Sequence, residues 1–158
     1  MTVIRLRTAI RAPIARCFDA ARDIDLHVRS TAGTNEEAVA AGGVTGGLLG
    51  PGEWVTWRAR HFGVTQSMTM RMAEFERPRR FVDEMVQGPF RRIRHVHEFT
   101  HQDEMTIMDD HFEYLTPLGP LGALADLLVL KQHMRGLLES RARLLRSAAE
   151  AGRSWGEE

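Results

Sequence analysis

The sequence predicts an α+β domain in which a curved antiparallel sheet of about six or seven strands packs on a long C-terminal helix. Two observations carry this prediction. Between residues 53 and 114, apolar and polar residues alternate in five segments that are joined by short turns. Parallel strands need a long crossover, so these connections indicate antiparallel hairpins. Beyond Pro117 and Pro120 the apolar spacing becomes helical.

The first forty residues predict one strand and two short helices. Residues 2–10 alternate imperfectly and are typical of a strand. Pro13 follows, and proline suits the first turn of a helix because no amide partner is needed there. The apolar face of that helix contains Ile14, Cys17, Phe18 and Ala21. Residues 24–29 predict a second short helix, and residues 34–40 a short strand.

The rest of the chain predicts the sheet and the long helix. The five segments with period two are residues 53–60, 65–75, 80–87, 91–100 and 105–114. A helix is expected over residues 121–149, with an apolar stripe on one side. The glycine-rich segment 42–52 lacks the Gly-Lys-Ser/Thr of a phosphate-binding loop and is interpreted as a flexible loop and turn. We therefore expect a single domain over residues 1–151, followed by a polar tail at 152–158.

Composition excludes several classes of function. The chain has 158 residues, and its 21 basic residues balance its 21 acidic residues, so no net positive charge attracts nucleic acid. A single cysteine excludes an internal disulfide and a cysteine-based zinc site. No apolar run is long enough to cross a membrane, and no leader segment is evident, so we expect a cytoplasmic protein without membrane insertion. No dinucleotide or nucleophile motif is present, and no cofactor is expected.

Several segments together resemble the START-like, or SRPBCC, superfamily, and most closely an uncharacterised bacterial branch labelled cyclase/dehydrase-like. They are the Ala12-Pro13 turn into a helix with Phe18, and segments 52–63, 78–81, 83–85, 88–90, 95–99, 110–114 and 117–122. The resemblance covers nearly the whole chain. It implies the helix-grip fold, in which a curved sheet wraps a long helix and leaves a cavity for an apolar molecule such as a lipid, isoprenoid or polyketide. Superfamily members range from carriers to enzymes such as polyketide cyclases, so the fold leaves the chemistry open.

Strand pairing predicts which residues face that cavity. A turn centred on Gln102-Asp103 pairs His95 with Asp110, and a three-residue loop at 88–90 pairs Asp83 with His95. The hairpin at 61–64 pairs Val55 with Met70. With two positions added from the final helix, the predicted ligand-binding residues are Val55, Trp57, Met68, Met70, Phe81, Met85, Ile93, His95, His97, Met108, Asp110, Phe112, Tyr114, Leu124 and Leu128; Met72 and Phe99 belong to the same inner face.

The polar residues on this inner face leave three alternatives open. His95 and His97 lie on one face of a strand, and with Asp83 or Asp110 they have ligand types that a metal uses. An Asp–His pair in an apolar pocket also suits general acid–base catalysis, with His95, Asp83 and Asp110 as candidates. The interpretation we adopt is a hydrogen-bonded network that anchors the polar end of a ligand, with no metal.

The expected partner is therefore a hydrophobic small molecule between the sheet and the helix, entering near the glycine-rich loop and the 116–120 turn. An enzyme of the cyclase or dehydratase type is the first alternative. A protein-interaction module is the second, because residues 124–130 are apolar on nearly all sides, and a homodimer would fit that pattern.

Overall fold

The computed structural model describes residues 1–39 and 41–152, and within them it confirms the predicted α+β architecture. Of the predicted tail at 152–158, residues 153–158 lie outside the described residues. In chain order the elements are β1 (Thr2–Ile10), α1 (Ile14–Ala21), α2 (Ile24–Ser30), η1 (Ala32–Thr34), β2 (Glu37–Val39), β3 (Trp54–His61), β4 (Val64–Glu76), β5 (Arg80–Gln87), β6 (Arg92–Gln102), β7 (Met105–Leu115), α3 (Gly119–Ala125), η2 (Asp126–Leu130) and α4 (Lys131–Glu150).

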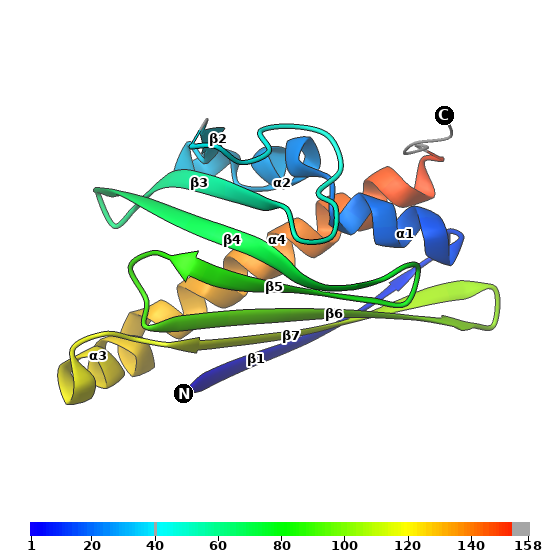
Figure 1. The fold of residues 1–158 in the computed structure, drawn as a ribbon. Helices are drawn as coiled ribbons and strands as arrows, with labels where there is room; N and C mark the ends of the chain where they lie inside the picture. The colour runs from blue at the N-terminus through cyan, green and yellow to red at the C-terminus, as the bar shows by residue number, and fades with distance from the viewer. Residues whose placement is uncertain (40, 153–158) are drawn as a thin grey trace.

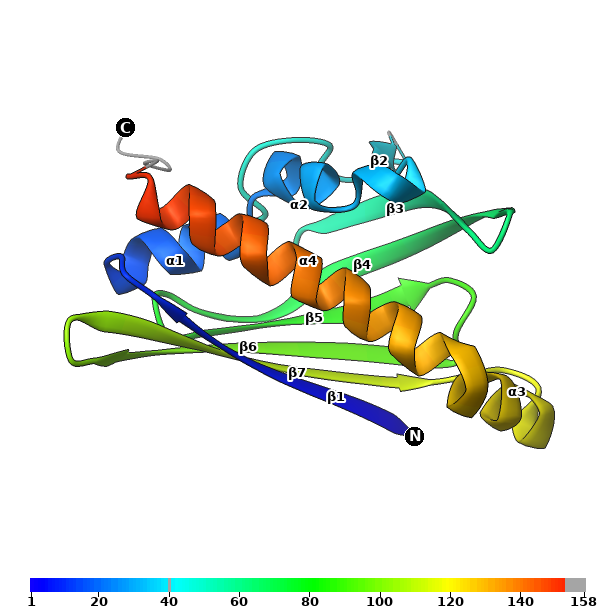
Figure 2. The same cartoon turned by 180° about the vertical axis from the view of Figure 1, so that it is seen from behind.

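The described strands form one antiparallel sheet of seven strands in the order β1-β7-β6-β5-β4-β3-β2. Helix α4 runs across one face of this sheet, and α1 and α2 lie beside α4 (Figure 1; Figure 2). Helix α4 therefore lies over strands that come from both the N-terminal and the C-terminal half of the sequence.

The core is densest where α1 meets the sheet. Phe18 of α1 is fully buried, and its ring lies 5.4 Å from Phe75, 5.2 Å from Phe81 and 5.5 Å from Phe99, all edge to face. Aromatic rings favour this arrangement because the positive edge of one meets the negative face of another. Helix α1 and three strands are thereby fixed together at one end of the molecule.

Two of the three predicted hairpin registers are confirmed. Val55 pairs with Met70, and Asp83 pairs with His95. The β6–β7 register is wrong by two residues, because His95 pairs with Phe112, and His97 pairs with Asp110. The turn is a tight two-residue one at Asp103-Glu104, with positive φ at both residues. A shift of two keeps every side chain on its predicted face.

The predicted C-terminal helix is confirmed over its length but contains a π-helical turn, η2. Asp126 in this turn is buried, and its carboxylate accepts hydrogen bonds from the hydroxyl groups of Tyr114 and Thr2. The turn is therefore joined to the end of the sheet. The preceding helix α3 lies beyond the end of β7 (Figure 2).

Gly122 allows α3 to pack against the turn that precedes it. A Cβ atom at this position would lie 1.9 Å from the backbone oxygen of Pro117. We expect Gly122→Ala to lower the free energy of unfolding by about 1–3 kcal/mol, the usual cost of overpacking. Gly136→Ala in α4, where no atom lies within 4 Å of the new Cβ, should instead raise it by about 0.5–1 kcal/mol. Urea denaturation of both variants checks this, and an unchanged Gly122→Ala stability would contradict the packing seen here.

Candidate functional site

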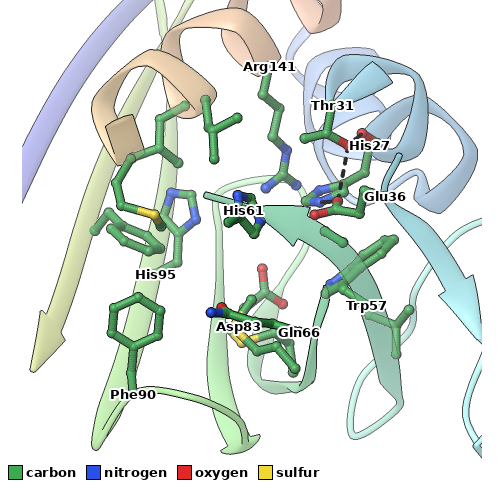
Figure 3. Close-up of a pocket in the computed structure, with 18 of the residues that line it drawn as sticks. His27, Thr31, Glu36, Trp57, His61, Gln66, Asp83, Phe90, His95 and Arg141 are labelled. Carbon is green, nitrogen blue, oxygen red and sulfur yellow. Dashed lines mark hydrogen bonds and ion pairs between the residues drawn. The ribbon is translucent and has the colours of Figure 1, made fainter. Parts of the chain in front are cut away.

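A cavity of about 320 Å³ lies between the inner face of the sheet and helix α4 (Figure 3). Its sheet wall is mostly apolar and contains Val55, Trp57, Ala59, Met68, Met70, Met72, Phe81 and Phe112. Its helix wall is formed by Leu130, His133, Met134, Leu137, Leu138 and Arg141. A mostly apolar hollow with a few polar groups is the usual form of a small-molecule site.

The predicted ligand-binding residues divide into three groups. Those that line the cavity are Val55, Trp57, Met68, Met70, Phe81, His95 and Phe112, together with the catalytic candidate Asp83. Those that lie on the same inner face but pack in the core beside the cavity are Met85, Ile93, His97, Met108, Asp110 and Tyr114. The third group consists of Leu124 and Leu128.

Leu124 and Leu128 do not line the cavity, so the placement predicted for them is wrong. Their side chains are 54% and 68% exposed. Two features explain the difference: α3 extends past the end of the sheet, and the π-helical turn adds a residue that rotates the apolar stripe. Leu121, Leu127 and Val129 in the same stretch are exposed as well. The association predicted from this stretch, a homodimer included, stays a prediction.

The glycine-rich segment is tied to the start of α2 by hydrogen bonds. The amide of Leu49 donates to the carbonyl of Arg22 at 3.0 Å, and the amide of Ile24 donates to the carbonyl of Gly47 at 2.9 Å. The Asp25 carboxylate also accepts from the Gly47 amide at 3.0 Å. Leu49 is consequently buried and contributes to the cavity lining.

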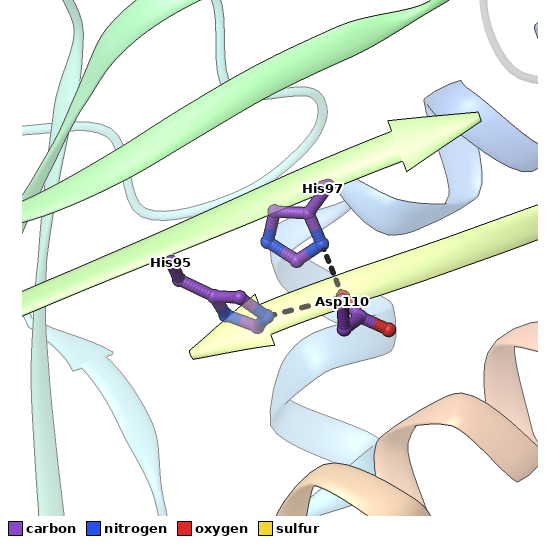
Figure 4. Close-up of side chains that lie close together, drawn as sticks. All are labelled: His95, His97 and Asp110. Carbon is purple, nitrogen blue, oxygen red and sulfur yellow. Dashed lines mark hydrogen bonds and ion pairs between the residues drawn. The ribbon is translucent and has the colours of Figure 1, made fainter. Parts of the chain in front are cut away.

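Four inner-face side chains form a buried ionic network on β5, β6 and β7. One Asp110 carboxylate oxygen lies 3.0 Å from Nε2 of His95 and 2.8 Å from Nδ1 of His97 (Figure 4). Nε2 of His97 lies 3.4 Å from the Asp83 carboxylate. The two His97 nitrogens do not have the geometry of a hydrogen bond. Their contacts with Asp110 and Asp83 are therefore mainly electrostatic.

The network separates the protonation behaviour of its two histidines. Burial and the neighbouring charge of His97 lower the pKa of His95 to about 4, although Asp110 opposes this. Burial also disfavours a charged His97, but Asp110 and Asp83 outweigh it and raise the pKa of His97. Burial alone would raise the pKa of Asp110, and its contacts with both histidines lower it. Near neutral pH, His95 is therefore neutral, and His97 is the group that can carry the positive charge.

Among the described residues, three members of this network have a spacing that suits a metal ion. Donor atoms of His95, His97 and Asp110 all lie within 4.8 Å of one another. Both histidines, however, are directed at one and the same Asp110 oxygen, one by a hydrogen bond and the other by an ion pair, so the donor atoms already contact one another. The expectation of no metal stays a prediction.

The sequence analysis missed a second polar group, which is centred on His27. The His27 ring stacks on Trp57 with 4.0 Å between ring centres, and its Nε2 lies 2.6 Å from the Glu36 carboxylate. Thr31 donates to the same carboxylate at 3.2 Å. Burial and the positive charge of Arg141 lower the pKa of His27 against the pull of Glu36. Arg141 was also missed, although its place beside Leu137, Leu138 and Leu145 on the apolar stripe was a signal.

His61 and His133 meet at the edge of the cavity. Both residues belong to the cavity lining. Their ring nitrogens Nδ1 and Nε2 lie 3.0 Å apart, and the Phe62 ring lies 4.7 Å from that of His133. Burial and His61 lower the pKa of His133. This contact joins the β3–β4 hairpin to α4.

The fold has counterparts among solved structures. The protein TTHA0849 from Thermus thermophilus aligns with a TM-score of 0.71 at 20% identity, over 94% of this chain and 99% of that one. The START superfamily protein from Mycobacterium smegmatis gives 0.66 at 10% over 94% and 97%, and major latex-like protein 151 from Panax ginseng gives 0.60 at 14% over 94% and 97%. These similarities confirm the predicted START-like helix-grip fold.

The remaining comparisons are negative. No known protein-family profile matches the chain, and no curated protein sequence matches it significantly. Of the helices in the described part of the chain, none has the length and apolar character needed to cross a membrane.

The low pKa of His95 predicts an acid-sensitive stability. Between pH 6.5 and about 4 the unfolded chain binds a proton at this residue, whereas the folded protein does not, so the free energy of unfolding falls as pH falls through this window. When the pH falls from 7 to 4.5, the free energy of unfolding should fall by roughly 2 kcal/mol less in His95→Gln than in the wild type. Urea denaturation at both pH values measures this.

The control for this experiment is His101→Gln, because His101 is exposed at the end of β6. That variant should lose as much stability as the wild type. An equal loss in His95→Gln would show that His95 is not kept neutral by the fold.

Proposed function

We propose that this protein binds an apolar small molecule of the lipid, isoprenoid or polyketide type in the cavity between the sheet and α4. The observation that carries the proposal is the cavity itself, about 320 Å³ in volume and lined mainly by methionine, leucine and aromatic side chains. Unfilled volume inside a protein costs stability, because the atoms around it lose packing contacts. We therefore interpret the cavity, which lies beside a well-packed core, as a binding site.

The composition of the walls supports an apolar ligand of adaptable shape. Met68, Met70 and Met72 follow one another on the inner face of β4, and Met134 faces them from α4. Methionine is flexible and polarisable, so such a wall accommodates different apolar surfaces. The resemblance to superfamily carriers points to the same role.

A second candidate function is acid–base catalysis of the cyclase or dehydratase type. One observation favours it: His95 lines the cavity, and the Asp110 carboxylate holds its Nε2 at 3.0 Å. A histidine whose pKa is about 4 is neutral at pH 7, so it would act as a base, and a weak one. General bases are most effective when their pKa lies near the working pH. This mismatch is the reason that binding is placed first.

A neutral fluorescent probe, N-phenyl-1-naphthylamine, tests binding in the cavity. We expect Met68→Trp to weaken its binding by roughly tenfold or more, because the indole would occupy space that the ligand needs. Ser67→Trp is the matched control, since Ser67 is the exposed neighbour on the outer face of the same strand. Fluorescence titration of the wild type and both variants gives the dissociation constants. Equal affinities in all three proteins, or no binding to the wild type, would reject the proposal.

Catalysis is separated from binding by His95→Gln. If His95 is the base, turnover of a polyketide-like substrate should fall by about 100-fold or more, whereas the affinity for the neutral probe should change little. Product formation is followed by mass spectrometry. Turnover that survives the substitution would remove His95 from the candidates.

A further inference from the structure

Arg141 brings a cationic group into the apolar cavity. It extends from α4, and its guanidinium points into the space between helix and sheet (Figure 3). One of its nitrogens, Nη2, donates to the backbone oxygen of Ala21 at 2.9 Å. No carboxylate of the described residues lies within 4.0 Å of the guanidinium, the distance of an ion pair.

Four acidic side chains in or near the cavity already have other partners. Glu36 pairs with His27 and accepts from Thr31, Asp83 pairs with His97, and Asp110 pairs with both network histidines. Asp19 is held by Arg22 and Arg77. Arg141 therefore makes no direct ion pair with a described residue, and the charges of Glu36 and Asp83 act on it only from beyond 4.0 Å.

A charge in apolar surroundings is costly unless a counter-charge or hydrogen bonds offset it. The guanidinium has five N–H donors, and a carboxylate accepts two of them in parallel. An anionic group on the ligand would thus supply the ion-pair partner that Arg141 lacks among the described residues. The apolar walls would at the same time hold the rest of the molecule.

Asp83 limits which anion fits. It faces the cavity from the sheet wall opposite Arg141 (Figure 3), and its Oδ1 is buried without a hydrogen-bond partner. Its negative charge opposes a doubly charged group such as a phosphate monoester. Its unpartnered oxygen can accept from a hydroxyl group that lies near the bound anion.

We propose that the ligand is an apolar monocarboxylic acid whose carboxylate pairs with Arg141 inside the cavity. This inference rests on the proposed function, since it names the class of molecule that the cavity binds. Arg141 is the specificity-determining residue in this arrangement, and the apolar walls contribute affinity that is common to acids and neutral analogues.

Displacement of N-phenyl-1-naphthylamine at pH 7.5 tests the inference with three ligands of equal chain length: dodecanoic acid, dodecan-1-ol and dodecyl phosphate. In the wild type the acid should bind about 30-fold more tightly than the alcohol, the lower range for a partly buried charge pair. The phosphate should bind more weakly than the acid. Arg141→Gln should remove the preference for the acid and change the affinity for the alcohol less than threefold.

Arg143→Gln is the matched control, because Arg143 lies two residues further along α4 and is exposed to solvent. It should behave as the wild type does. Arg141→Lys keeps the charge without the planar fork and should retain part of the preference. Circular dichroism and binding of the neutral probe establish that each variant is folded.

Equal binding of acid and alcohol to the wild type would overturn the inference, as would a preference that survives Arg141→Gln or a phosphate that binds more tightly than the acid. In each case the probe and the alcohol still bind, so the proposed function stands. A wild-type protein that binds neither the probe nor any of the three ligands would overturn both.

Discussion

One helix lies across a sheet that is far wider than the helix. Seven strands at a spacing of about 4.8 Å span roughly 29 Å, whereas a helix with its side chains is about 10–12 Å across. Helix α1 and the aromatic group around Phe18 fill the space at one end of the sheet. In the part of the chain that the structure describes, no comparable helix and aromatic group fill the space between α4 and strands β3 to β5, and the cavity follows from this difference in width.

The cavity in turn decides where polar groups can be placed. The polar side chains on the inner face of β5, β6 and β7 are largely buried, and each carboxylate among them meets a histidine at short distance. A second cluster, built from α2 and Glu36, closes the other side of the hollow against Trp57. Such clusters are tolerated in a low-dielectric interior because each carboxylate has a histidine within 3.4 Å. Arg141 differs from them because it lines the cavity without an ion-pair partner among the described residues, and the proposed selection of an acid rests on it.

The ionic network also connects packing with chemistry. His95 stands at the cavity wall, and its protonated form is disfavoured first by burial and then by His97, whose ring centre lies 3.8 Å from its own. The two carboxylates favour the charge on His97, and this charge opposes a second one on His95. The network thus presents a neutral imidazole to the cavity, which suits a hydrogen bond to a ligand better than proton transfer at neutral pH.

Much of this protein was determined by local properties of the chain. Alternation with period two assigned the strands, and because side chains alternate strictly, even the shifted β6–β7 register left His95, His97 and Asp110 on the inner face. The helical stripe after Pro120 located the final helix. Short loops made the sheet antiparallel. These inferences needed only neighbours in sequence.

Tertiary structure decided what depends on distant parts of the chain. The pairing of His27 with Glu36 requires α2 and the segment before β2 to fold against Trp57. The position of Arg141 in the cavity depends on how α4 crosses the sheet, and the exposure of Leu124 and Leu128 depends on a π-helical turn and on where the sheet ends. Periodicity gives the face of an element but not the angle or the height at which that face meets its partner. The sequence by itself therefore determined the fold and the apolar side of the cavity, and the tertiary structure decided which charges meet inside it.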